Sequence, residues 1–133
     1  MHEYRNAYLH LIVDEQAGLL YSEWVRRPNS AEYREAAGVF ADCLRGGGIA
    51  FWIQDTSRLG EVPAEDLRVV LWELVPVAAS SLRKLARIAP DESNMARFLE
   101  LARQAKAHLN TEIEIRQFTT YREAAEWIWS HRL

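Results

Sequence analysis

Apolar and polar residues follow one another along the chain in a pattern that predicts strands separated by helices. Residues 8–13 and 19–25 are two short, mainly apolar runs. The segment 14–18 between them is mostly polar and ends in glycine, so the two runs are expected to form an antiparallel hairpin. Residues 49–53 are continuously apolar, which is typical of a strand buried on both faces in a parallel sheet.

A first helix is expected after Pro28. Asn29 or Ser30 can cap it, because their side chains accept hydrogen bonds from the N–H groups that a helix start leaves unpaired. Apolar residues then recur at helical spacing, at Tyr33, Ala36, Ala37, Phe40, Cys43 and Leu44. Three consecutive glycines, 46–48, are expected to end this helix, since glycine adopts the left-handed conformation of a helix cap.

A second helix is expected to begin at Pro63, which suits a first helical position. Glu65 and Asp66 then lie in the first turn, where the helix dipole favours negative charge. The predicted apolar face consists of Leu67, Val70, Leu71, Leu74 and Ala78. Pro76 removes one helical hydrogen bond, so it is expected to kink or end the helix.

The last third of the chain predicts a strand at 83–89, a helix at 94–109, a strand at 112–118 and a final helix. In the strand 112–118, Ile113 and Ile115 alternate with polar residues. Thr120 and Glu123 are spaced as a capping box for the final helix. The residues expected to point inward are Met95, Phe98, Leu99 and Ala102 in the first of these helices and Tyr121, Ala124, Ala125 and Ile128 in the second.

The predicted order β-β-α-β-α-β-α-β-α indicates one α/β domain over residues 1–133 with a mixed five-stranded sheet, because strands that alternate with helices pair in parallel. Of the 133 residues, 49% are apolar and 26% are charged, which are typical fractions for a globular domain. Cys43 is its only cysteine, so no internal disulfide can form. The polar N-terminus and the short apolar stretch 69–79 predict a cytoplasmic protein without a membrane span.

The charge pattern favours no nucleic-acid partner. The net charge is −3 with both signs interspersed, whereas nucleic-acid binders usually carry a basic stripe. The later half of the chain is locally basic, but acidic residues lie among the basic ones, so a solvated surface is expected there. These basic residues are Arg83, Lys84, Arg87, Arg97, Arg103 and Lys106.

Several short motifs, taken together, resemble the STAS domain, a family named after sulphate transporters and anti-sigma-factor antagonists, and especially its small stand-alone bacterial members. The motifs are Leu19-Leu20-Tyr21-Ser22-Glu23-Trp24, Phe51-Trp52-Ile53-Gln54-Asp55, Val75-Pro76 and Tyr121-Arg122-Glu123-Ala124-Ala125-Glu126-Trp127. The resemblance implies that strands two to five are parallel and adjacent in sequence order, with the first strand antiparallel at one edge. It also implies helices mainly on one face, leaving Leu20 and Trp24 to form an apolar surface for a homodimer on the other.

The same resemblance suggests a phosphoacceptor loop at Asp55, Thr56, Ser57 and Arg58. In phosphorylated STAS domains a serine at the helix start after the third strand is modified, and a phosphate on Thr56 or Ser57 would be able to pair with Arg58. The corresponding helix start here, 63–66, has no hydroxyl and carries two carboxylates, which would repel a phosphate. The alternative is that Asp55, Thr56 and Ser57 form local turn hydrogen bonds.

No catalytic or metal-binding set stands out. The four histidines lack the spacing of a metal site, and Cys43 falls on a predicted buried stripe, where a thiol is not reactive. Glycines 46–48 precede a strand instead of following one, so they do not match a phosphate-binding loop. The chain is therefore predicted to be non-enzymatic, with no cofactor and no metal.

The five tryptophans point to a binding surface. The predicted partner or ligand surface consists of Trp72, Val69, Pro76, Trp52 and Trp24. Two hypotheses follow. The first is a regulatory or interaction module that binds a protein, or itself, through the second helix and loop 55–62. The second is a small-molecule or lipid-binding protein, since CRAL-TRIO domains look similar in architecture and a pocket lined by Phe40, Trp52 and Leu71 would hold an acyl chain.

Overall fold

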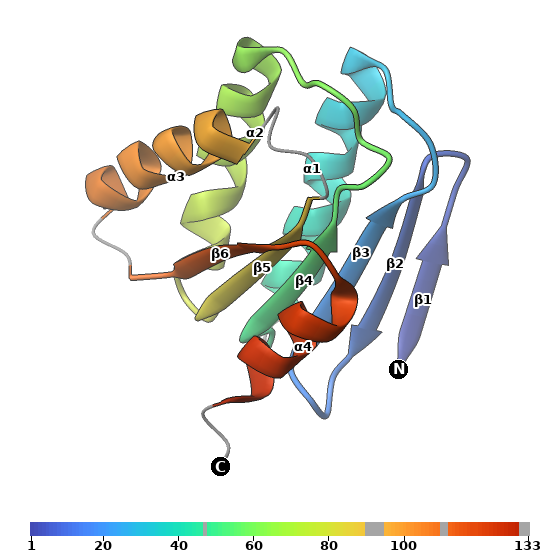
Figure 1. The fold of residues 1–133 in the computed structure, drawn as a ribbon, viewed down its shortest axis with the longest axis vertical. Coiled ribbons are helices and arrows are strands. Elements are labelled where there is room, and N and C mark those ends of the chain that lie inside the picture. The colour runs from blue at the N-terminus through green and yellow to red at the C-terminus, as the bar shows by residue number, and fades with distance from the viewer. Residues whose placement is uncertain (47, 90–94, 110–111, 131–133) are drawn as a thin grey trace.

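Strands lie side by side in the order of the sequence (Figure 1). The computed structural model describes residues 1–46, 48–89, 95–109 and 112–130. Within them, six strands form one mixed sheet. The strands are β1 (His2–Arg5), β2 (Leu9–Asp14), β3 (Leu19–Trp24), β4 (Phe51–Asp55), β5 (Lys84–Ile88) and β6 (Glu114–Phe118). The pairs β1–β2 and β2–β3 are antiparallel, and β3 to β6 are parallel. The predicted α/β class is confirmed.

Helices cover both faces of this sheet, unequally. They are α1 (Ser30–Arg45), α2 (Ala64–Ala78), α3 (Met95–Leu109) and α4 (Tyr121–Trp129). Figure 1 shows α1, α2 and α3 on one face and the short helix α4 on the other. The main core lies between the sheet and α1–α3, and a smaller core lies between α4 and the middle strands, around Ile53, Ala86 and Ile128.

The prediction of five strands is wrong, because His2–Arg5 forms a further strand at the edge next to β2. All four of its residues are exposed and most are polar, so they carry no apolar pattern to reveal a strand. The Asn6 side chain closes the turn after it by accepting hydrogen bonds from the backbone N–H groups of Tyr8 and Leu9. The strand 8–13, implied to be an edge strand, therefore lies inside the sheet as β2.

Leu20 and Trp24 do not form a surface on the opposite face, contrary to the expectation above. Both are buried in the main core, because alternate residues of β3 point toward the helices. The other face of β3 carries Leu19 and Tyr21 instead, and Tyr21 packs edge-on against Tyr121 of α4 with ring centroids 5.7 Å apart. The stated basis for a homodimer on that face is therefore lost.

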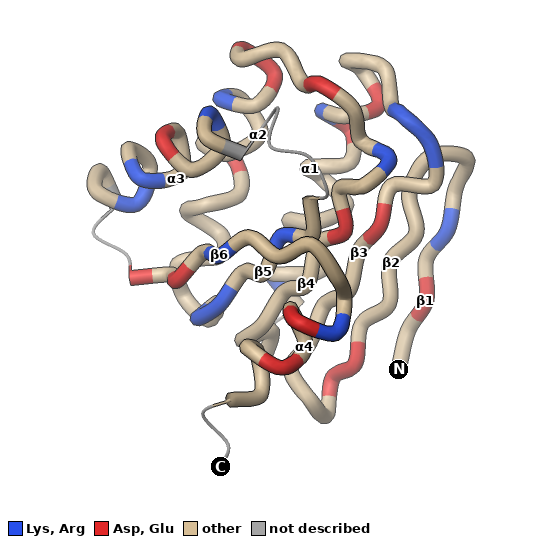
Figure 2. The backbone as a smooth tube through the Cα atoms, in the orientation of Figure 1, with Lys and Arg blue, Asp and Glu red and all other residues tan. Residues whose placement is uncertain are grey.

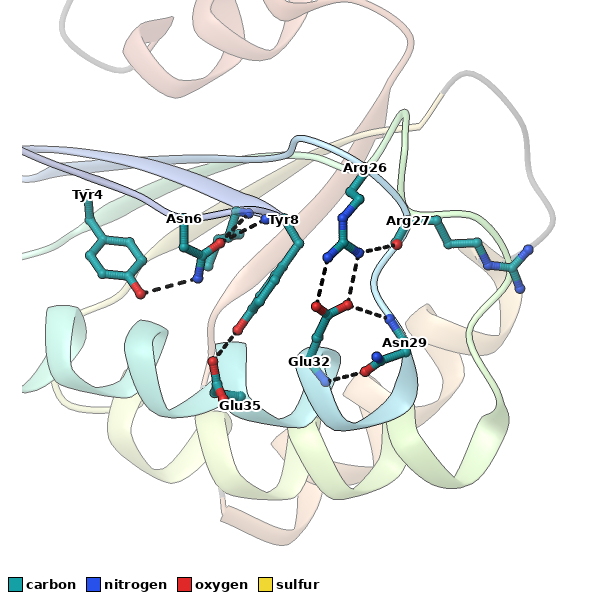
Figure 3. Close-up of polar contacts among 9 residues, drawn as sticks. Tyr4, Asn6, Tyr8, Arg26, Arg27, Asn29, Glu32 and Glu35 are labelled. Atoms are coloured by element: carbon teal, nitrogen blue, oxygen red, sulfur yellow. Dashed lines mark hydrogen bonds and ion pairs between the residues drawn. The ribbon is translucent and has the colours of Figure 1, made fainter.

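The predicted start of α1 is confirmed at Asn29. Its side chain accepts a hydrogen bond from the Glu32 N–H, and Glu32 in turn accepts one from the Asn29 N–H (Figure 3). Arg26 holds the same carboxylate through two hydrogen bonds of 2.9 and 2.8 Å. These bonds satisfy the N–H groups of Asn29 and Glu32 and tie Arg26, in the segment after β3, to the first turn of α1.

The other helix boundaries are close to the predicted ones. Pro63 is the N-cap of α2 and not its first helical residue as expected, and α2 ends two residues after Pro76.

Two side chains differ from the prediction. Leu99 and Tyr121 were expected to point inward but are 39% and 53% exposed. The side chain of Met95, and Gly47 among the three glycines, lie outside the described residues. Within the described part of the chain, no helix is both long and apolar enough to cross a bilayer.

Candidate functional site

An apolar pocket lies between the sheet and helices α1, α2 and α3. Its volume is about 60 Å³, several times the roughly 10–15 Å³ that one water molecule needs. Phe40, Trp52 and Leu71, the three residues expected to line an acyl-binding pocket, all line it. Further side chains of the wall come from every layer around it, namely Trp24, Tyr33, Val70, Leu74, Leu85, Phe98, Ala102 and Ile113.

Aromatic rings form a continuous wall on one side of the pocket. Trp24 stacks on Tyr33 with centroids 5.6 Å apart and meets Phe40 edge-on at 6.1 Å. Phe40 then contacts Trp52, with centroids 4.9 Å apart. The buried indole N–H of Trp52 donates a hydrogen bond of 2.9 Å to the Ser22 hydroxyl, so the polar group of Trp52 is satisfied within the sheet.

Tyr8 packs against this aromatic wall. Its ring stacks on Trp24 with centroids 6.3 Å apart, and its hydroxyl donates a hydrogen bond to Glu35 of α1 (Figure 3). Burial, reinforced by the neighbouring Glu35, raises the pKa of the Tyr8 hydroxyl to about 12, so it stays protonated and remains the donor. The contact joins Tyr8, the residue before β2, to α1.

A row of polar side chains crosses the floor of the main core. Ser22, Gln54, Arg87 and Gln117 are direct neighbours on β3, β4, β5 and β6 and share the face covered by α1–α3. The last three stand one residue before the carboxyl ends of their strands. In parallel α/β sheets, ligands bind at this end. Ser22 and Gln117 already have partners, because Ser22 accepts from Trp52 and Gln117 donates to the Ala89 carbonyl at 3.1 Å.

Arg87 is the unusual member of this row. It is 3% exposed, and its Nε is buried without a hydrogen-bond partner. Within the described ranges, no carboxylate pairs with it. Its guanidinium carbon lies 3.7 Å from the centre of the Phe98 ring of α3. Burial lowers the pKa of Arg87 to about 10, so the group is still charged at neutral pH. An unpaired buried charge is strongly destabilising, and such a group calls for a functional explanation.

The pocket has a positive charge bias. Arg87 and the half-buried Lys106 of α3 contribute its charged groups, and no acidic residue is found in that lining as far as the structure describes the chain. Elsewhere the two signs are interspersed over helices and strands, as Figure 2 shows. The bias therefore belongs to the interior and does not reflect a basic surface. The prediction that the protein has no nucleic-acid partner stays untested.

The expectation that the later basic residues form a solvated surface is wrong for Arg87 and Lys84, which are buried at 3% and 9% exposure. Lys84 points to the opposite face, where its ammonium donates a 3.0 Å hydrogen bond to the Trp127 carbonyl. Arg87 was missed because a single arginine in a basic segment resembles surface. The available signal was its phase, since Arg87 falls two residues after the apolar Leu85 and therefore on the same face of the strand.

The five residues of the predicted partner or ligand surface separate into two groups. Trp72 and Val69, each 37% exposed, lie on the outer side of α2 together with the exposed Pro76. Trp72 also packs edge-on against the His108 ring of α3, with centroids 5.0 Å apart. Trp24 and Trp52 are buried and line the pocket. The structure thus places one group at the molecular surface and the other inside.

The loop after β4 makes the turn hydrogen bonds of the second interpretation. Ser57 donates to Asp55 through its backbone N–H at 2.9 Å and through its hydroxyl. The Thr56 hydroxyl donates to the Ile88 carbonyl at 2.8 Å, and Arg58 donates to the Val25 carbonyl at 3.3 Å. Helix α2 begins only at Ala64. Phosphorylation of Thr56 or Ser57 stays a prediction.

Other chemistry has less support. Among the residues whose placement is described, no group of three His, Cys, Asp or Glu side chains is arranged to hold a metal. Cys43 is half-buried, and burial raises the pKa of its thiol, which disfavours the reactive thiolate. Comparisons of the chain with models of known families, with curated proteins and with solved structures found no match. The STAS and CRAL-TRIO resemblances therefore stay predictions.

Proposed function

We propose that the protein is a non-enzymatic binding module that takes a small, mostly apolar molecule into the pocket between its sheet and helices α1–α3. The observation that carries this proposal is the pocket itself, about 60 Å³ within the main core and lined mainly by aromatic and aliphatic side chains. Small-molecule sites are typically concave and apolar with a few polar groups. Gln54 and Arg87 supply such groups at the strand ends.

The size of the pocket limits the ligand. A volume of about 60 Å³ accommodates the equivalent of a few water molecules, so a compact molecule or the end of a short chain fits without rearrangement. A longer acyl chain would require α3, which packs on α2, to move away from the sheet. We therefore favour a short or compact ligand over a long-chain lipid.

A pocket-filling variant tests this proposal. Ala102 lines the pocket and is buried, whereas Ala107 on the same helix is exposed. Ala102→Met should abolish binding of 1-hexanol, measured by NMR titration, and should remove any small molecule that co-purifies in native mass spectrometry. Ala107→Met adds the same side chain outside the pocket and should behave like the parent. Equal binding by both variants would place the ligand elsewhere.

A second candidate function is a regulatory module, STAS-like and cytoplasmic, that binds a protein or its own copy through the outer face of α2. It is supported by the exposure of Trp72 and Val69, which leaves an indole and a β-branched side chain in water on one helix. Aromatic residues are enriched in protein interfaces. Trp72→Ala should lower the oligomeric mass seen by light scattering, while Arg68→Ala on the same helix should not. An unchanged mass would contradict self-association through this face.

A further inference from the structure

The charge of Arg87 defines the ligand more closely. We propose that the pocket binds an amphipathic carboxylate, with its apolar part against the aromatic wall and its carboxylate on the guanidinium of Arg87. This inference rests on the proposed function, because it needs the pocket to be a ligand site, and it adds the chemical class of the ligand.

The geometry of Arg87 leaves its donors available. One face of the guanidinium is covered by the Phe98 ring, at 3.7 Å from the ring centre. The N–H donors of a guanidinium lie in its plane, so stacking on a ring does not use them. The Nε is buried with no partner, and the side chain lines the pocket. The donors of Arg87 therefore lie in a buried site where a ligand can accept them.

The neighbouring groups that the structure describes do not supply a counter-charge to Arg87. Burial raises the pKa of the Tyr33 hydroxyl to about 12, so this residue of the pocket wall is neutral. Asp66, the buried acidic residue of α2, is held at 2.7 Å by the Ser30 hydroxyl and at 2.8 Å by Arg34. Arg87 is thus a buried cation in a pocket lining whose described residues include no carboxylate.

A carboxylate fits this position better than other polar groups. It pairs with a guanidinium through two parallel hydrogen bonds, and charge-assisted bonds of this kind are stronger than neutral ones. Gln54, the direct neighbour of Arg87 in the sheet register, carries an amide that can donate to the same anion. The second basic residue of the lining, Lys106, disfavours a cationic ligand.

The test compares three ligands of equal length at pH 7, hexanoate, 1-hexanol and hexylammonium, by NMR titration of the indole N–H signals. Hexanoate should bind at least tenfold more tightly than 1-hexanol, and hexylammonium should not bind. The signals of Trp24 and Trp52 should shift, whereas that of Trp72, outside the pocket, should not. Arg87→Met should reduce the affinity for hexanoate to that for 1-hexanol, and Arg83→Met, at an exposed position just before β5, should change neither.

The possible failures are distinguishable. Equal affinities of hexanoate and 1-hexanol for the parent protein would overturn the carboxylate inference and leave the apolar pocket in place. If no ligand of the series binds, the proposed function fails as well. Asp91 and Glu92 follow β5 in the sequence and lie outside the described residues. If the double variant Asp91→Asn, Glu92→Gln bound hexanoate more tightly than the parent, an internal carboxylate would be the partner of Arg87, and the proposal would be overturned.

Discussion

The guanidinium of Arg87 on β5 lies 3.7 Å from the ring centre of Phe98 on α3. This contact places a positive charge against an aromatic face inside the main core, where cation–π attraction is stronger than in water. The attraction offsets only part of the hydration free energy that the Arg87 charge loses on burial. The pair therefore marks a position where the fold accepts a cost in stability, and that cost has a measurable consequence.

Removing this charge should stabilise the ligand-free protein. Arg87→Met keeps an unbranched side chain of similar length and abolishes the unpaired charge, so the free energy of unfolding in urea should rise by about 1–4 kcal/mol. Arg83→Met, at an exposed position, should stay within about 0.5 kcal/mol of the parent. A loss of stability in Arg87→Met would show that the guanidinium has a stabilising partner within the chain.

Two tryptophans should respond very differently to truncation. Trp24 is 4% exposed and contacts Tyr8, Tyr33 and Phe40, so Trp24→Ala should cost about 3–5 kcal/mol of unfolding free energy. Trp72 is 37% exposed, and Trp72→Ala should cost clearly less. Chemical denaturation of both variants checks the difference. Similar losses would mean that Trp72 contributes to the core more than its exposure indicates.

The contribution of the α1 N-cap to the free energy of unfolding should be measurable by itself. Asn29→Ala removes the hydrogen bond from the Glu32 N–H, 2.8 Å in length, and should lower the unfolding free energy by about 0.5–2 kcal/mol. Asn29→Gly should lower the unfolding free energy by only a few tenths of a kcal/mol, since glycine suits the cap conformation and lets water reach the N–H groups. Thermal unfolding of the two variants gives the comparison, and equal losses would contradict a capping role.

His10 should make stability depend on pH. Its two ring nitrogens contact Glu23 at 3.0 Å and Glu3 at 2.7 Å, and these carboxylates raise the pKa of His10 above 6.5, with Glu23 the larger cause. Because the folded-state pKa is the higher one, this stabilisation is complete below about pH 6.5 and is lost as the pH rises through the folded-state value. Further ionisable groups beside this cluster are Arg5, opposite His10 on β1, the hydroxyl of Tyr21, and Asp55, opposite Glu23 on β4.

The melting temperature, followed from pH 6 to pH 9, should therefore fall more in the parent than in His10→Asn. Glu23→Gln should reduce the fall, because it removes the larger cause of the raised pKa. If the parent and His10→Asn lose the same stability over this range, the His10 contacts do not contribute to folding.

Local sequence carried enough information for most of the elements. The helices and the strands β2 to β6 each contain a local apolar pattern, either periodic or continuous, and the start of α1 has its own capping residues, Asn29 and Glu32, so neighbours in the sequence suffice to predict them. The apolar pocket residues Phe40, Trp52 and Leu71 were also predictable as a set, because buried positions on successive elements of a parallel α/β sheet converge on one layer.

The tertiary structure alone decided the remaining features. β1 is a strand because β2 offers it an edge to pair with, and nothing within His2–Arg5 shows this. The burial of Arg87 depends on the register of β5 between β4 and β6 and on the placement of Phe98 above it. Apart from β1, the sequence by itself determined which segments are strands and helices, since apolar patterning is a local property. Which face each charge and each indole meets depends on contacts between distant segments, and only packing determines those.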